Sequence, residues 1–389
     1  MDRVVIVGGS IAAVRAVEGL RDLGYKGRLT LVGAERHLPY DRPPLSKQAL
    51  VTGDLSATRL HDRAWYDERE VELLLGTPAT ALDTEHRQLR VADRTLPYDG
   101  LVIATGAQPR SMAMVADPSL VHELRTLDDL ARIHEAFGRS RRLCVVGAGF
   151  IGLEIAAAAR ASGLDVVVLE SDPTPLFRHL GADAGAWLGR LHERHGVDVR
   201  CGTSVSAVHG RPGAVRVELR DGATLEVDAV VVGVGVRPAT DWLESSGLRL
   251  GDGVTCDESL RTSVPGIVAA GDVASWHHRL YGRSMRVEHW TTAAEQGRHA
   301  AATLLGEMLP YEAVPYVWSD QWSARLRLVG TTTGADRVKV LASSDTTLEV
   351  VFGNADRVLG ALCVNAAKRL VVHRQAIARA TPWQDLTTV

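Results

Sequence analysis

The chain has 389 residues, a formal net charge of −3 and 46% hydrophobic residues. This length exceeds one ordinary hydrophobic core and predicts two or three domains. The near-neutral charge provides no overall field that would select nucleic acid or an anionic membrane. No apolar run approaches the roughly 20 residues that cross a bilayer, and no secretory signal is recognisable, so we expect a cytoplasmic protein without a membrane partner.

Cysteine and lysine are both scarce. Cys144, Cys201, Cys256 and Cys363 stand apart, and none forms a C-x-x-C or C-x4-C pair. We therefore expect no metal site, no disulfide framework and no dithiol relay. Of the 44 basic residues only four are lysines, which makes each lysine worth inspecting.

The first elements alternate strand and helix. Residues 4–8 (VVIVG) predict a buried strand, residues 11–24 a helix, and residues 28–35 a second strand, which together form a βαβ unit of a parallel sheet. A loop rich in proline follows at 37–47. The pattern at 102–106 (VIATG) is again a buried strand that ends at a glycine, where open α/β sheets bind ligands.

The turn after the first strand has the layout of the dinucleotide fingerprint G-x-G-x-x-G. Only Gly8 is a glycine in its expected position, because Ser10 and Ala13 take the other two. Glu35 ends the next strand, where an acidic residue binds ribose hydroxyls. Strand, helix and acid are in register, so we predict a nucleotide site. Ser10 would there either hydrogen-bond a phosphate oxygen or crowd the pyrophosphate.

Residues 141–171 repeat this unit with a complete fingerprint. Gly147 permits the tight turn, Gly149 lets the backbone approach a pyrophosphate, and Gly152 lets the helix pack close to the strand. The N-terminus of the helix supplies free N–H groups to the phosphates. Two such units in one chain predict either two dinucleotides, or one dinucleotide and a decayed copy of the site.

Glu170 ends the strand that follows the second turn, in the position that Glu35 has in the first unit. A carboxylate there binds the ribose of NAD and repels a 2′-phosphate, which favours NADH over NADPH. Arg178 would weaken this preference if it folded over the site.

The two units also end alike. Residues 96–110 (LPYDGLVIATGAQPR) and 225–240 (LEVDAVVVGVGVRPAT) share a short strand, an aspartate, a second strand, a glycine and a proline next to an arginine. The mirrored ends predict that the second unit is inserted in the first. Beyond 315 the pattern changes to alternating strands followed by a helix at 366–380.

We therefore predict an α/β fold with two Rossmann-like nucleotide-binding domains, the second inserted in the first, and a C-terminal α+β domain. The expected boundaries are 1–110 and 239–315 for the first domain, 111–238 for the second and 316–389 for the third.

Seven segments, in this order, resemble the FAD-dependent NADH–ferredoxin reductases of bacterial oxygenase systems, which have a glutathione-reductase-like fold. They are VVIVGG, LVGAERHLPYDRPPLSK, VIATGAQPR, VVGAGFIGLE, AAGDVA, VEHWTTAAEQG and WSDQW, and they span nearly the whole chain. The resemblance implies that the first nucleotide unit holds FAD, that the inserted unit holds NADH, and that the third domain covers the flavin.

The resemblance also implies a role for individual residues. Lys47 would lie beside flavin N5 with Glu154 as its ion partner, and Trp318 would lie near the flavin and the nicotinamide; these three are the candidate catalytic residues. The FAD residues would be Gly8, Ser10, Ala13, Glu35, Arg42, Lys47, Thr105, Gly106, Asp272, Val273, Glu288, His289, Trp290 and Trp318. The NADH residues would be Gly147, Gly149, Phe150, Ile151, Gly152, Glu154, Glu170, Arg178 and Gly235. Trp322 is interpreted as core packing.

The loop at 37–47 contains no cysteine, unlike the corresponding loop of thiol-dependent enzymes with this fold. We therefore expect electrons to leave directly from the flavin, singly, to a small iron–sulfur ferredoxin that supplies a monooxygenase or a Rieske dioxygenase. The alternatives are a rubredoxin or flavorubredoxin reductase, an NADH oxidase or diaphorase, and a flavoprotein that acts as an NADH sensor. The sequence leaves the oligomeric state open.

Overall fold

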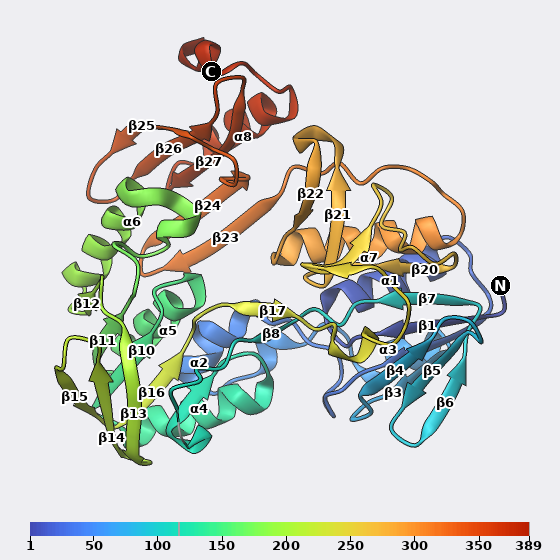
Figure 1. The fold of residues 1–389 in the computed structure, drawn as a ribbon, viewed down its shortest axis with the longest axis horizontal. Coiled ribbons are helices and arrows are strands. Elements are labelled where there is room, and N and C mark those ends of the chain that lie inside the picture. The colour runs from blue at the N-terminus through green and yellow to red at the C-terminus, as the bar shows by residue number, and fades with distance from the viewer. Residues whose placement is uncertain (116, 389) are drawn as a thin grey trace. The chain divides into compact units, whose positions relative to one another are not determined.

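A computed structural model describes residues 1–115 and 117–388 (Figure 1). The chain forms two compact units. Unit 1 comprises residues 1–41, 58–108 and 237–315, and unit 2 comprises residues 42–57, 109–236 and 316–389.

Unit 1 is built on a parallel sheet with the strand order β20-β7-β1-β2-β3. It also contains an antiparallel sheet β4-β5-β6 and a four-stranded sheet β18-β19-β21-β22. Its strands are β1 (Arg3–Val7), β2 (Arg28–Val32), β3 (Val71–Leu74), β4 (Ala79–Asp83), β5 (Gln88–Val91), β6 (Arg94–Pro97), β7 (Gly100–Ile103), β18 (Leu250–Gly251), β19 (Gly253–Cys256), β20 (Ile267–Ala269), β21 (Ala274–His278) and β22 (Arg283–Arg286). Its helices are α1 (Ile11–Asp22), α3 (Arg63–Glu68) and α7 (Trp290–Leu304), with short 3₁₀ turns at η4 (Asp241–Leu243) and η5 (Arg279–Tyr281).

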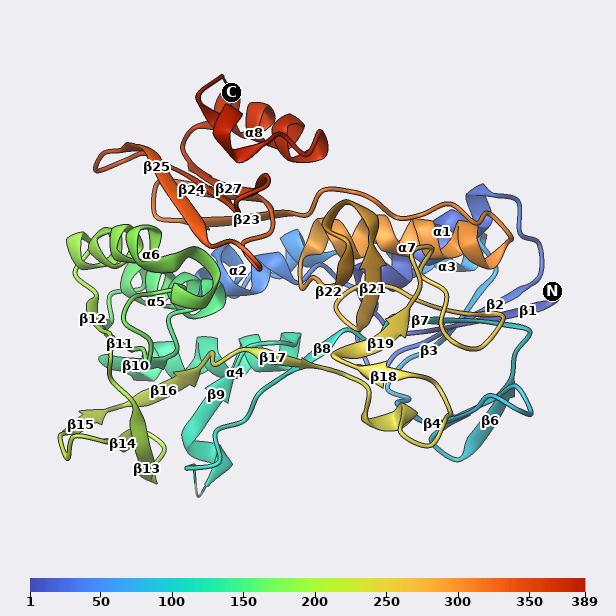
Figure 2. The same ribbon diagram turned by 45° about the horizontal axis from the view of Figure 1, so that its top comes forward.

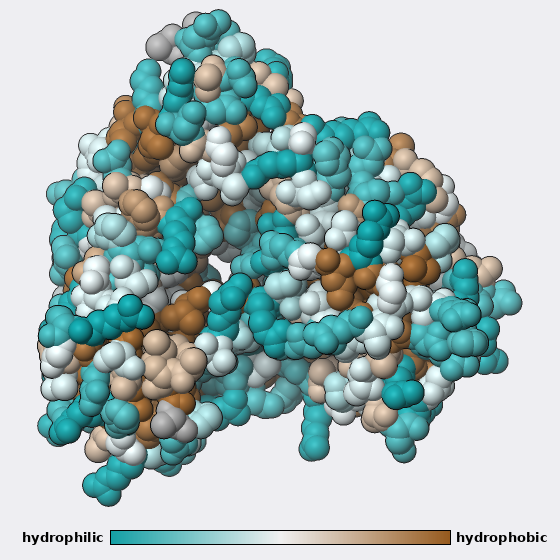
Figure 3. Space-filling model, viewed as in Figure 1, coloured by the Kyte–Doolittle hydropathy of each residue, from teal (hydrophilic) through white to brown (hydrophobic). Residues whose placement is uncertain are grey.

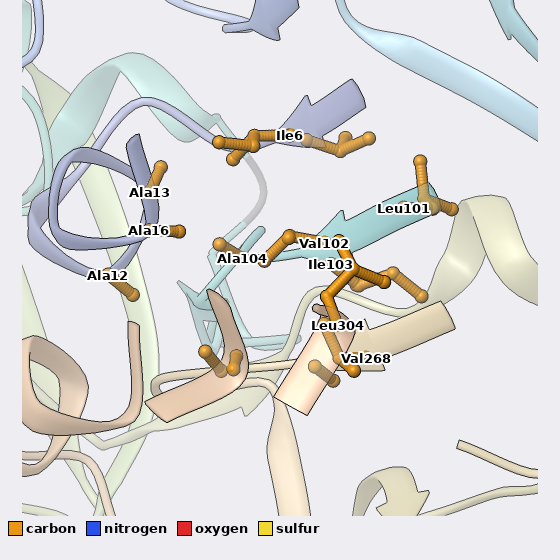
Figure 4. Close-up of a cluster of buried hydrophobic side chains, with 14 of the residues drawn as sticks. Ile6, Ala12, Ala13, Ala16, Leu101, Val102, Ile103, Ala104, Val268 and Leu304 are labelled. Atoms are coloured by element: carbon orange, nitrogen blue, oxygen red, sulfur yellow. The ribbon is translucent and has the colours of Figure 1, made fainter. Parts of the chain in front are cut away.

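The core of unit 1 lies between the parallel sheet and the two helices α1 and α7. The small side chains Ala12, Ala13 and Ala16 of α1 face the sheet, where Ile6 of β1 and Val102 of β7 are fully buried (Figure 4). A parallel strand buried on both faces needs a continuous apolar run, which explains the VVIV and LVI segments.

Unit 2 contains a second parallel sheet, β12-β11-β10-β16-β9, beside an antiparallel sheet β13-β14-β15. The strands are β9 (Val121–Glu123), β10 (Arg142–Val146), β11 (Asp165–Leu169), β12 (Asp198–Arg200), β13 (Val205–Arg211), β14 (Ala214–Leu219), β15 (Thr224–Val227) and β16 (Ala229–Val232). The helices are α2 (Gln48–Thr52), α4 (Leu127–Arg139), α5 (Phe150–Ala161) and α6 (Phe177–Arg194), with 3₁₀ turns at η1 (Pro43–Ser46) and η3 (Pro118–Leu120). Where the chain passes between units, η2 covers Ser56–Thr58, and β8 (Ala107–Pro109) and β17 (Val236–Pro238) form a two-stranded sheet.

The C-terminal part of unit 2 is an antiparallel sheet with the order β23-β24-β27-β26-β25, and α8 packs on β24 and β27 (Figure 2). The strands are β23 (Tyr316–Gln321), β24 (Ala324–Gly330), β25 (Arg337–Ser343), β26 (Leu348–Gly353) and β27 (Val358–Val364), followed by α8 (Ala367–Ala378) and the 3₁₀ turn η6 (Trp383–Thr388). Along β23 the side chains alternate: Val317, Ser319 and Gln321 are buried, whereas Trp318 is only half-buried. This alternation follows from the pleat of a strand.

The two parallel sheets repeat each other down to single hydrogen bonds. The N–H of Gly8 donates to the carbonyl of Val32, and the N–H of Gly147 donates to the carbonyl of Leu169, both at 2.8 Å. The two mirrored aspartates make the same hydrogen bonds. The carboxylate of Asp99 accepts hydrogen bonds from the backbone N–H groups at the start of β1, and that of Asp228 accepts hydrogen bonds from those at the start of β10.

The predicted fold class is confirmed, including the insertion of the second Rossmann-like unit in the first. The segment at 37–47, predicted as a loop, contains the 3₁₀ turn η1 and leads into α2. The domain boundaries stay a prediction.

No helix in the described part of the chain is long and apolar enough to cross a membrane. On the face seen in Figure 3, hydrophilic residues predominate and the hydrophobic patches are separated from one another.

Candidate active site

The first glycine turn is tight because of Gly8. Its φ is +137°, and a Cβ added there would lie 2.1 Å from the carbonyl oxygen of Ala104. Ser10 precedes α1 in an extended conformation, and its side chain makes no capping hydrogen bond to the helix. Ala13 is fully buried, so its methyl group occupies the helix–strand interface where the fingerprint expects glycine.

Glu35 lies in a small pocket beside this turn. The Tyr40 hydroxyl donates a hydrogen bond of 2.6 Å to the Glu35 carboxylate, which fixes the orientation of the acid. The pocket is lined by Gly9, Gly33, Ala34, Glu35, His37, Tyr40 and Leu75. A carboxylate and small residues next to a helix N-terminus fit the ribose of an adenine nucleotide.

Thr105 and Gly106 lie where β7 leaves the sheet. Gly106 has a φ of +69°, which favours glycine. Its carbonyl oxygen accepts the N–H of Ala239 at 3.0 Å, and the Thr105 hydroxyl donates to the Ala239 carbonyl at 3.0 Å. The outgoing and returning segments are thus held together at the carboxyl edge of the unit 1 sheet.

Asp272 and Val273 follow β20 at the same edge. The side chain of Val273 is fully buried in the core, so a contact between this residue and FAD would involve its backbone. The carbonyl of Asp272 accepts a hydrogen bond of 3.1 Å from Arg286. The N–H of the preceding Gly271 donates to the side chain of Gln296 on α7, at 2.9 Å.

The N-terminus of α7 is the other predicted flavin contact in unit 1. His289 precedes the helix and makes no capping hydrogen bond with its side chain. The Trp290 indole N–H donates to the Asp41 carboxylate, and Glu288 forms an ion pair of 2.6 Å with Arg286. An N-terminus without a side-chain cap presents the positive end of a helix dipole.

The three glycines of the second turn have two different roles. A Cβ on Gly147 would lie 2.4 Å from the carbonyl oxygen of Gly233, and one on Gly152 would lie 2.1 Å from that of Gly147. A Cβ on Gly149 would meet nothing closer than 4.0 Å. Packing therefore requires Gly147 and Gly152, whereas the space beside Gly149 is open. This cradle fits a pyrophosphate.

Glu170 closes the second turn. One carboxylate oxygen accepts the N–H of Ala148 at 2.7 Å, and the other accepts the N–H of Asp172 at 2.9 Å. Arg178 forms an ion pair of 2.9 Å with Asp172. Because this pair occupies the arginine, it opposes the weakening of NADH preference that Arg178 would cause by folding over the site.

Apolar side chains surround the second turn. Ile151 on the first turn of α5 is 46% exposed, and Val234, which follows Gly233, is 40% exposed. Gly235 has a φ of +96°, and its carbonyl accepts the N–H of Arg110 at 2.9 Å. Phe150, the first residue of α5, is half-buried. Exposed apolar surface beside a phosphate cradle fits a ligand with flat rings.

Lys47 and Glu154 form the predicted ion pair, within unit 2. The Lys47 ammonium lies 2.7 Å from a carboxylate oxygen of Glu154. The Glu154 side chain is 3% exposed, and that of Lys47 is 26% exposed. The hydroxyl of Ser46 donates to the same oxygen, and that of Ser319 donates to the other oxygen at 2.5 Å. Three donors thus stabilise a carboxylate that burial alone would destabilise.

Trp318 and Trp322 differ in their surroundings. Trp318 faces away from Ser319 on β23 and is stacked with Tyr316, with ring centroids 6.2 Å apart. Trp322 lies in the turn after β23 with a φ of +56° and stacks on His195 at 4.1 Å. This packing agrees with the interpretation of Trp322 as structural.

The predicted FAD residues are divided between the units. Arg42, Lys47 and Trp318 belong to unit 2, and the others belong to unit 1. Arg42 donates a hydrogen bond of 2.7 Å to the carbonyl of Arg125 within unit 2. The convergence of both sets on one FAD stays a prediction.

Comparison with known families identifies the chain. Residues 2–297 match the model described as pyridine nucleotide-disulphide oxidoreductase, and residues 316–387 match the model described as reductase C-terminal. The chain belongs to the pyridine nucleotide-disulphide oxidoreductase family. This confirms an oxidoreductase that uses FAD and NADH.

Sequence relatives and a solved structure are similar to this chain over nearly its whole length. The ferredoxin–NAD(+) reductase component of the anthranilate 1,2-dioxygenase system of Burkholderia cepacia is 37% identical, over 97% of this chain and 94% of that protein. Putidaredoxin reductase of Pseudomonas putida is 36% identical, over 98% and 93%. In the covalent putidaredoxin reductase–putidaredoxin complex, a chain with 35% identity matches with a TM-score of 0.93, over 98% of this chain and 94% of that one. The resemblance stated from the motifs is confirmed.

The thiols of this family member do not suit disulphide chemistry. All four cysteines are unpaired, and only Cys201 is not fully buried. Burial raises the pKa of Cys201 to about 11 and the pKa values of Cys144, Cys256 and Cys363 to about 12. A thiol must be ionised to attack or to accept electrons, so these groups are inert near neutral pH.

Residues that we did not single out complete the site. Tyr40 orients Glu35, Asp41 binds Trp290, and Ser46 and Ser319 hold Glu154. All of them lie inside the PYDRPPLSK and WSDQW segments. These two segments could have indicated them, since in each segment the polar residues lie close to a residue that we predicted to belong to the site.

Proposed function

We propose that this oxidoreductase is an NADH-dependent ferredoxin reductase, which delivers single electrons to a small iron–sulfur ferredoxin that supplies an oxygenase. The observation that carries the proposal is the state of the four thiols, which are unpaired and have strongly raised pKa values. Without a reactive thiol, electrons leave directly from the flavin. The similarity to ferredoxin–NAD(+) reductase components of dioxygenase systems supports the same partner.

The residues present fit both cofactors. The open space beside Gly149 fits a pyrophosphate, and the Glu35 carboxylate, held by Tyr40, lies at the end of a strand where an acidic residue binds ribose hydroxyls. When bound, FAD takes two electrons from NADH and passes them on one at a time. Lys47, held by Glu154, provides a fixed positive charge where the resemblance places flavin N5. A charge already in position stabilises added electron density without reorganisation.

The test is NADH-driven reduction of cytochrome c by the purified protein with a panel of [2Fe–2S] ferredoxins, repeated with rubredoxin and with NADPH. We expect NADH to bleach the flavin and at least one ferredoxin to restore its colour faster than oxygen does. If only rubredoxin restores the colour, the proposal of a ferredoxin as the partner is wrong. If oxygen or quinones are fastest, the protein is an oxidase or diaphorase. We also propose that it acts in the cytoplasm, which fractionation of the source cells tests.

A further inference from the structure

A chain of buried hydrogen bonds extends from the Lys47–Glu154 pair into unit 2. Ser319 donates to Glu154 at 2.5 Å, the amide nitrogen of Gln321 donates to the Ser319 hydroxyl at 3.0 Å, and the Gln321 oxygen lies 2.9 Å from Nε2 of His192. Gln321 and His192 are fully buried, and Ser319 is nearly so. The four groups come from α5, β23 and α6.

Every link in this chain donates toward the carboxylate. The Gln321 oxygen can only accept, so Nε2 of His192 carries a proton and donates it. Burial lowers the pKa of His192 to about 4, so the imidazole is neutral with its single proton on Nε2. The Gln321 amide in turn donates to Ser319, which uses its own proton for Glu154. Hydrogen bonds aligned in one direction polarise one another and end on the negative charge.

An ordinary core would place apolar residues at these positions. Burying a hydroxyl, an amide and an imidazole costs free energy that only good hydrogen bonds offset. Nδ1 of His192 has no hydrogen-bond partner in the described structure, so only one of the two ring nitrogens of this buried imidazole is hydrogen-bonded. Its single bond is directed to Gln321, which ties α6 to β23.

We propose that Ser319, Gln321 and His192 are positioning residues, which keep the Glu154 carboxylate fixed and thereby hold the Lys47 ammonium in place. The function given to Lys47 rests on the proposed reductase activity, whereas the positioning itself does not. Trp318 shares β23 with Ser319 and Gln321 but faces the opposite side of the strand. The same strand therefore carries Trp318 on one face and, through Ser319, holds Glu154 on the other.

The lysine content of the chain provides a direct assay. Only Lys26, Lys47, Lys339 and Lys368 are present, and the three others are exposed. Brief acetylation of the full-length protein, followed by mass spectrometry, measures the reactivity of Lys47 with three internal references. In the wild type, we expect Lys47 to react more slowly than the other three, because its ammonium is held by Glu154.

Ser319→Ala and Gln321→Met each interrupt the chain. We expect the acetylation rate of Lys47 to rise about threefold to tenfold in both variants, the effect of one typical hydrogen bond, while the rates of the other lysines do not change. His192→Leu should act in the same direction. Ser319→Thr keeps the hydroxyl and His192→Gln can keep the donor, so both should stay near the wild-type rate.

Thr303→Val is the matched control, since it removes a buried hydroxyl that donates to the carbonyl of Ser259 in unit 1. It should leave Lys47 reactivity unchanged, and thermal unfolding shows which variants are folded. A folded Ser319→Ala or Gln321→Met protein with Lys47 reactivity within twofold of wild type overturns the proposal, as does an equal rise in Thr303→Val. A failure of the reductase proposal would appear instead in the ferredoxin assay and would leave this labelling pattern intact.

Discussion

Gly152→Ala is the substitution that most directly tests how the second turn places NADH. The added Cβ would lie 2.1 Å from the carbonyl oxygen of Gly147, whereas a carbon and an oxygen in contact are about 3.3 Å apart. The turn and α5 must therefore separate by about 1 Å. No rotamer change relieves this contact, because the methyl group of alanine has no alternative position and its neighbour is backbone.

Two effects of known size follow from this shift. Overpacking of a close helix–strand contact destabilises a protein by about 1–3 kcal/mol. A displacement of about 1 Å at a binding site can lower the rate by about a hundredfold. Since Gly8 and Glu35 belong to unit 1, we expect the variant to retain FAD while its rate of flavin reduction by NADH falls by about thirty- to a hundredfold.

The assay is anaerobic stopped-flow measurement of flavin bleaching against NADH concentration, with FAD content measured from the absorbance spectrum. Gly138→Ala is the control, because it lies in α4 of the same unit and an added Cβ meets nothing within 4 Å. That variant should be as stable as the wild type or slightly more so. A wild-type rate of flavin reduction in a folded Gly152→Ala protein would refute the reasoning.

Three further predictions concern single residues. Glu170→Gln should narrow the preference for NADH over NADPH in kcat/KM, and adding Asp172→Asn, which releases Arg178, should narrow it further; an unchanged ratio would exclude this role for Glu170. With a pKa of about 11, Cys201 is about 0.1% ionised at pH 8, so its reaction with Ellman's reagent should be slow there and accelerate as pH rises toward 11. Rapid reaction at pH 8 would contradict the burial of this thiol. Ser10→Gly should weaken FAD binding about two- to tenfold in a fluorescence titration if the hydroxyl binds a phosphate, whereas tighter binding would mean that Ser10 crowds it.

Local patterns were sufficient for both nucleotide units. The glycine positions, the apolar strands and the acids that end them lie within about 30 residues of each other, a span in which backbone geometry dictates residue type. Gly8 and Gly147 have positive φ values in the structure, as a tight turn requires. The matching Asp99 and Asp228 explain why the mirrored ends revealed the insertion.

The predicted roles of Lys47 and Glu154 came from the resemblance. A lysine after a proline-rich loop and a glutamate in a helix have no local feature that pairs them across 107 positions of sequence. The structure brings them together and adds Ser46 and Ser319, whose contribution depends on burial and hydrogen-bond geometry. Neither property can be calculated from the neighbours of a residue in sequence.

Composition and short-range pattern were thus enough to establish the two dinucleotide folds, the insertion and the absence of a paired thiol, because each depends on residues close in the chain. The tertiary structure alone decided which polar side chains surround Glu154, because Ser46 and Ser319 lie 108 and 165 positions away from it in the sequence. It also showed that the space beside Gly149 is open while that beside Gly152 is filled. The surroundings of Glu154 arise where distant segments exclude water together, and there the strength of each polar contact is set by its partners.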